Sequence, residues 1–162
     1  MGQTEEERRN VEAFRIIVER IINDGEFALC DIYMDPAMVI SRFGLAATAA
    51  LLAPDRPKLG GGGAIEGFKA GLAMLRTAFP DWSHRIEKIV AKDDWVSGVW
   101  TLNCTHQGNF MGLAPTGAAI SMAETGVMRF VDGRMVEGWF LGDELGLVRQ
   151  LGVELAPGNG GR

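Results

Sequence analysis

The sequence predicts an α+β fold in which helices of the N-terminal half pack over the concave face of a curved antiparallel sheet. Two observations lead to this prediction. Apolar residues recur at helical spacing in the first half, whereas the second half consists of strand-like stretches divided by turn signals. Because consecutive strands joined by tight turns pair antiparallel, no crossover helices are needed, and the helices are left to cover one face.

The first element is an amphipathic helix. Thr4 and Glu7 have the spacing of a capping box, and apolar residues then recur at helical spacing as far as Ile22. Gly25 is expected to end this helix. Residues 26–33 are predicted to form a short second helix or a turn.

The middle of the chain combines a strand, a loop and a second long helix. Residues 38–43 have the β-branched and apolar content of a strand, and residues 45–52 fit either a helix or a buried loop. Two prolines and four successive glycines make residues 54–63 a loop. Residues 65–79 have a continuous apolar stripe, which predicts an amphipathic helix.

The second half has the two-residue period of strands. Strands are expected at residues 83–91, 95–106, 118–131 and 134–141. Asp132 and Gly133 form the strongest hairpin signal in the chain, and residues 143–151 are predicted to form a short terminal helix. We expect one domain over residues 1–155 and a disordered tail over residues 156–162.

Composition excludes several classes of function. The 16 basic and 21 acidic residues give a net charge of −5, so no nucleic-acid partner is expected. The longest apolar run, residues 45–53, is too short to span a membrane, and the polar start of the chain predicts a cytoplasmic protein. Two histidines and two cysteines without metal-ligand spacing argue against a metal site, and the cysteines are expected to be free thiols.

Two carboxylates are the leading candidates for chemistry. Asp143 follows a hydrophobic strand, where burial would raise its pKa and make it a usable base, although capping of the last helix explains it equally well. Glu124 shares strand parity with Met122 and Met128, which favours an inward side chain paired with Arg129 or Arg134.

Histidines and aromatic residues supply further candidates. His106 lies at a strand end, where a structural role and a catalytic role are both open, whereas His84 is expected at the surface. Aromatic rings suit a pocket for a flat ligand, although most must belong to the core. The residues assigned to substrate binding are Phe68, Trp82, Trp100, Arg129 and Trp139.

Four segments resemble the SnoaL-like polyketide cyclase family over residues 64–152. They are AFPDW (78–82), THQGNFMGLAPTG (105–117), RFVDGRMVEGW (129–139) and DELGLVRQLG (143–152). The resemblance implies the cone-shaped fold of the nuclear transport factor 2-like superfamily, a homodimer, and a hydrophobic small-molecule substrate. It also implies chemistry without a cofactor, in which Asp143 acts as acid and base in an intramolecular aldol closure.

One departure from the family pattern leaves the function open. The cyclases commonly carry a histidine on the strand before the Arg-x-x-Asp-Gly turn, whereas this chain has Gly126, Val127 and Met128 there. The first hypothesis is therefore a polyketide cyclase or related tailoring enzyme, with Asp143, His106 and Glu124 as catalytic candidates. The alternatives are a non-catalytic ligand-binding or dimerisation module, or an isomerase or hydrolase acting on a carbonyl or epoxide.

Overall fold

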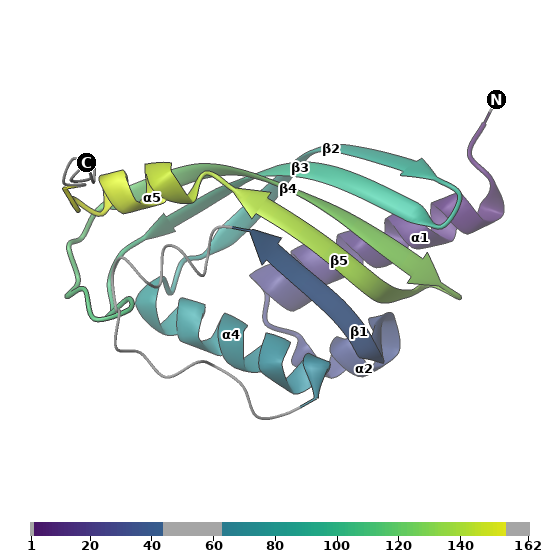
Figure 1. The fold of residues 1–162 in the computed structure, drawn as a ribbon, viewed down its shortest axis with the longest axis horizontal. Coiled ribbons are helices and arrows are strands. Elements are labelled where there is room, and N and C mark those ends of the chain that lie inside the picture. The colour runs from purple at the N-terminus through teal and green to yellow at the C-terminus, as the bar shows by residue number, and fades with distance from the viewer. Residues whose placement is uncertain (1, 44–62, 155–162) are drawn as a thin grey trace, which may run out of the picture.

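A computed structural model describes residues 2–43 and 63–154 of the chain. The described residues form a five-stranded curved sheet that lies over the N-terminal helices (Figure 1). The segment at 45–52, most of the predicted loop at 54–63 and the predicted tail at 156–162 lie outside these residues. The predicted α+β class is confirmed.

The sheet has the strand order β1-β5-β4-β3-β2. Its strands are β1 (Met34–Phe43), β2 (Ser83–Lys92), β3 (Trp95–Thr105), β4 (Ala119–Val131) and β5 (Arg134–Gly142). Neighbouring strands from β2 to β5 pair antiparallel, as predicted, but β1 runs parallel to β5. The sheet is therefore mixed. No tight turn joins β1 to β5, so no local sequence signal sets the direction of β1.

The helices that precede β2 form the second layer, whereas the last helix lies at the end of the sheet (Figure 1). The helical elements are α1 (Glu5–Arg15), the π-helix η1 (Ile16–Asn23), the 3-10 turn η2 (Phe27–Leu29), α2 (Cys30–Tyr33), α4 (Ala64–Ala78) and α5 (Glu144–Gln150). The predicted capping box is present, since Thr4 Oγ1 accepts from the Glu7 amide at 3.1 Å and the Glu7 carboxylate accepts from the Thr4 amide at 2.8 Å. Among the described residues, no helix is long and apolar enough to cross a membrane.

The predicted hairpin between β4 and β5 is confirmed. Asp132 and Gly133 have φ angles of 51° and 76°, the left-handed conformation that a tight two-residue hairpin turn requires at both positions. Aspartate and glycine reach this region at lower cost than other residues, which is why the pair is a strong signal.

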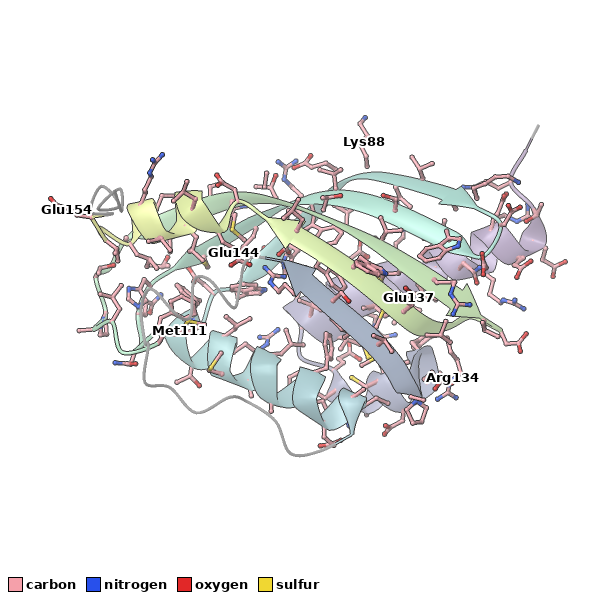
Figure 2. All side chains as sticks on the ribbon, in the orientation of Figure 1. Lys88, Met111, Arg134, Glu137, Glu144 and Glu154 are labelled. Carbon is pink, nitrogen blue, oxygen red and sulfur yellow. The ribbon has the colours of Figure 1, made fainter. Side chains whose placement is uncertain are left out.

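The two faces of the sheet differ in burial. On β3 and β4, inward side chains such as Trp100 and Met128 are buried, and the side chains between them point outward. A Cβ atom on Gly126 would lie 2.6 Å from Trp100 Cη2, so glycine lets the Trp100 ring pack flat on the sheet. Figure 2 shows Lys88 projecting from the face turned away from the helices.

Candidate functional site

Glu124 is a buried carboxylate on the helix-facing side of the sheet. Only 5% of the residue is exposed, and it shares the inner face with Met122 and Met128, as strand parity predicted. Its cross-strand partners are Trp100 on β3 and Gly142 on β5. Burial of a carboxylate is costly unless it is paired, so the neighbours of Glu124 decide what it can do.

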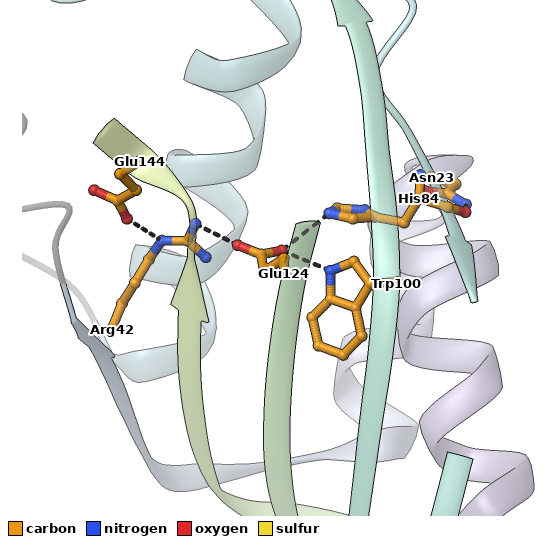
Figure 3. Close-up of polar contacts among 6 residues, drawn as sticks. All are labelled: Asn23, Arg42, His84, Trp100, Glu124 and Glu144. Atoms are coloured by element: carbon orange, nitrogen blue, oxygen red, sulfur yellow. Dashed lines mark hydrogen bonds and ion pairs between the residues drawn. The ribbon is translucent and has the colours of Figure 1, made fainter. Parts of the chain in front are cut away.

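Three side chains from three different strands meet the Glu124 carboxylate (Figure 3). Trp100 Nε1 donates to Oε2 at 2.6 Å, and Arg42 on β1 forms an ion pair and hydrogen bond with Oε1. His84 Nε2 on β2 lies 3.3 Å from Oε2 and is not aligned as a hydrogen bond. Burial by itself raises the pKa of Glu124, but His84, Arg42 and Trp100 together outweigh it and lower this pKa to about 2.

Arg42 extends this cluster to the last helix. Its Nε donates to Glu144 Oε1 at 3.3 Å, and Glu144 is only 6% exposed. The prediction that Glu124 pairs with Arg129 or Arg134 is wrong. Arg134 instead donates to backbone carbonyls of residues 31 and 34, and Arg129 pairs with carboxylates of residues 94 and 137.

His84 is buried, so its predicted surface position is wrong. Only 7% of the residue is exposed, and its ring packs edge-on against Trp82 and Trp100 with centroids 5.3 Å and 6.0 Å away. Parity with Ile86 on β2, and with Trp82 just before this strand, was the signal that would have placed it inside, because alternate residues of a strand share one face.

Asp143 is exposed, which contradicts its predicted burial. The strand ends at Gly142, and the Asp143 side chain turns back to cap α5 by accepting from the Gly146 amide at 2.9 Å. Its own amide donates to the carbonyl of Ala123 at 3.1 Å, which places its backbone beside Glu124. The capping alternative is therefore confirmed.

A hollow of about 430 Å³ lies where β5 ends and the chain passes into Asp143. It is lined by Val99, Ala123, Glu124, Thr125, Leu141, Gly142 and Asp143. Val99 and Leu141 are exposed, so the hollow opens on the outer face of the sheet. The apolar pocket that the sequence predicts between the helices and the sheet stays a prediction.

His106 belongs to a different cluster. It is fully buried, its ring packs against Phe79 and Phe110 with centroids 5.3 Å and 6.5 Å away, and its Nδ1 accepts from the Thr116 amide at 3.2 Å. Burial lowers its pKa, which favours the neutral ring. These contacts tie His106 to the segment that precedes β4, and its predicted catalytic role stays a prediction.

The aromatic candidates divide between the two faces. Trp82 and Trp100 are buried on the inner side, and Phe68 on α4 is partly buried against the core. Trp139 lies on the outer face with 41% of its surface exposed, and its Nε1 donates to Glu137. Arg129 is also on the outer face, with its guanidinium 6.0 Å from the centre of the Trp95 ring. The structure therefore does not bring Trp139 and Arg129 to the Glu124 cluster.

Both cysteines are free and buried. Burial raises the pKa of Cys104 to about 12 and also raises that of Cys30. A thiol with such a pKa carries almost no thiolate near neutral pH, which disfavours nucleophilic catalysis. Within the described ranges, no group of three or more potential ligands is placed to hold a metal ion.

Known proteins share both the sequence pattern and the fold. Two related proteins are aklanonic acid methyl ester cyclases, DnrD from Streptomyces peucetius and DauD from Streptomyces sp. (strain C5). Each is 34% identical to this chain over 89 residues, which is 54% of the chain. The matched segment spans only 61% and 55% of those relatives. The crystal structure of IdmH from Streptomyces antibioticus is 28% identical, covers 89% of this chain and 99% of its own, and has a TM-score of 0.71.

A second solved structure and a family model extend the likeness. A SnoaL-like structure from Jannaschia sp. CCS1 has a TM-score of 0.77 and covers 96% of this chain and 99% of its own, but at 18% identity it shows the fold alone. The model of the SnoaL-like polyketide cyclases matches residues 15–151. Because that match runs from the last residue of α1 to the end of α5, the chain belongs to the SnoaL-like polyketide cyclase family.

Proposed function

We propose that the protein closes a ring in a polyketide-like carbonyl substrate by an intramolecular aldol reaction that needs no cofactor. The family match over residues 15–151 carries this proposal. The reaction requires an acid–base group beside a site where a folded substrate can bring two of its carbons together. We place that site where β5 passes into α5, because Asp143 and the buried Glu124 cluster lie next to each other there.

Asp143 is the proposed base. Its carboxylate takes the proton from a carbon next to a carbonyl, and the resulting enolate carbon attacks a second carbonyl carbon of the same molecule. The electron pair of that C=O bond moves to its oxygen, which then takes the proton from the Asp143 carboxyl group and becomes a hydroxyl. Asp143 is exposed at the helix start, so a bound substrate can reach it without unfolding α5.

The first test is turnover of aklanonic acid methyl ester, the compound named for the related cyclases. We expect Asp143→Asn to lower kcat by roughly 10²- to 10⁴-fold, the usual contribution of a general base. Asparagine is a good N-cap, so the variant should keep α5 and the overall stability. Asp132→Asn, in the exposed β4–β5 turn, is the matched control and should retain full activity.

Two results would contradict the proposal in different ways. Unchanged turnover in Asp143→Asn would remove this carboxylate from the chemistry. A wild-type protein that binds the ester without converting it would favour the alternative of a non-catalytic binding module. The capping role of Asp143 and the absence of a histidine at 126–128 agree with that alternative.

We also propose that the protein forms a homodimer through the outer face of the sheet. Val39, Val99 and Val127 expose 62%, 43% and 37% of their surfaces there, and Val127 lies on the central strand β4. Exposed apolar side chains on a central strand favour burial against a second copy. We expect a dimer by analytical ultracentrifugation and a monomer for Val127→Arg. Ile32→Arg, on α2 and outside the sheet, is the control, and a wild-type monomer would refute the proposal.

A further inference from the structure

Gly146 lies three residues after Asp143, in the first turn of α5, and the proposed reaction assigns it no role. A Cβ atom at Gly146 would lie 2.2 Å from Asp143 Oδ2, 2.7 Å from its Cγ and 3.0 Å from its Oδ1. Such separations lie well inside the usual contact distance of atoms that are not bonded to each other. The Asp143 carboxylate therefore occupies the space that a side chain at position 146 would fill.

The backbone amide of Gly146 holds the same carboxylate. It donates to Asp143 Oδ1 at 2.9 Å, and it has no other acceptor among the described residues. The first amides of a helix find no partner within the helix, so this amide depends on the carboxylate. Asp143 Oδ2 accepts no hydrogen bond from the described part of the chain. Oδ2 is therefore the oxygen that is left to take a proton from the substrate.

The turn that contains both residues is fixed to β4, which extends beyond the end of β5. The Asp143 amide donates to the carbonyl of Ala123 at 3.1 Å. The side chain of Gln150 accepts from the Ser121 amide at 2.9 Å and donates to the carbonyls of Ser121 and Gly146, both at 3.1 Å. Backbone groups of β4 that lack a strand partner are thus satisfied by α5. These contacts fix the carboxylate relative to the sheet and to the hollow that Asp143 lines.

We infer that Gly146 is a positioning residue for the Asp143 carboxylate. This inference rests on the proposed ring closure. The missing side chain leaves room for the carboxylate, and the amide orients it so that Oδ2 faces the substrate. An alanine Cβ would displace the carboxylate by about 1 Å or more. Because the carboxylate ends a short, rotatable side chain, it will move while the backbone of α5 stays. A displacement of this size lowers a reaction rate by roughly 10²-fold.

Kinetics with aklanonic acid methyl ester provides the first test. Gly146→Ala should lower kcat by roughly 10²-fold and leave KM unchanged. The Tm should stay within about 4 °C of the wild-type value, because the better helix propensity of alanine offsets the lost cap. Gly67→Ala is the matched control and should keep the full rate, since Gly67 is exposed on α4 with no described atom within 4 Å of the added Cβ. An unchanged kcat in Gly146→Ala would overturn the inference.

A double-mutant cycle separates positioning from a general structural effect. Gly146→Ala should lower the kcat of the wild type but not that of Asp143→Asn, which has no base left to misplace. Equal losses in the two backgrounds would show that Gly146 only supports the structure, and the inference would be overturned.

Hydrogen exchange tests the placement of the carboxylate without turnover. The amide of residue 146 should be protected in the wild type, and Gly146→Ala should reduce its protection factor to the level measured in Asp143→Ala, where the acceptor is absent. Protection that persists in Gly146→Ala would overturn the inference. A wild type that does not convert the ester, combined with the expected loss of protection, would overturn only the proposed ring closure.

Discussion

Replacement of Glu124 by alanine is expected to lower the free energy of unfolding by about 3–5 kcal/mol, the usual cost of removing one member of a buried ion pair. The change leaves Arg42 without one of its two carboxylates and Trp100 Nε1 without its acceptor. Arg42 lies on β1 and Trp100 on β3, so the substitution removes contacts that link three strands of the sheet. Urea unfolding followed by tryptophan fluorescence measures the effect.

Glu137 is a matched control for this experiment. It also accepts from an indole nitrogen, that of Trp139 at 2.7 Å, and from an arginine, Arg129 at 3.2 Å. Its side chain is 28% exposed on the outer face, whereas that of Glu124 is 4% exposed. Because water screens the outer pair, Glu137→Ala should cost no more than about 1 kcal/mol. Equal losses in the two variants would show that burial does not set the strength of the Glu124 cluster.

Acid should destabilise the protein through the same carboxylate. Folding lowers the pKa of Glu124 from 4.5 to about 2, so the folded state binds the proton more weakly than the unfolded state. This stabilisation is complete above about pH 5 and is lost as the pH falls through the folded value. At 1.36 kcal/mol for each pKa unit, it amounts to about 3 kcal/mol.

The measurement is the free energy of unfolding between about pH 6 and pH 2 for the wild type and for Glu124→Gln. Glu7, Glu26, Asp81 and Glu137 also have lowered pKa values, so the wild-type curve contains several contributions. Glutamine keeps an oxygen for Trp100 and removes the titration. The difference between the two curves should shrink as the pH falls, and parallel curves would contradict the assignment.

Local sequence patterns predicted most of the fold. The capping box at Thr4, the hairpin at Asp132 and Gly133, and the strands β2 to β5 are all confirmed, because each depends on residues near one another in the chain. The inward position of Glu124 is confirmed for the same reason, since alternation along one strand fixes the face. The direction of β1 was not predicted, because no turn joins it to β5.

The partners of Glu124 show where local patterns fail. Arg42 lies 82 positions away in the sequence and reaches Glu124 only because β1 runs parallel to β5 in one particular register. His84 reaches it across β3, from the far edge of the sheet. For Asp143 the sequence left burial and helix capping equally open, and the bend from β5 into α5 decides for the exposed cap.

The sequence by itself determined the α+β class, the boundaries of most elements and the face on which Glu124 lies, because periodicity and turn chemistry act over a few residues. Only the tertiary structure decided that Glu124 meets His84, Arg42 and Trp100 and that Asp143 caps a helix. Strand order and register bring together residues that are remote in the chain, and no local pattern encodes that pairing.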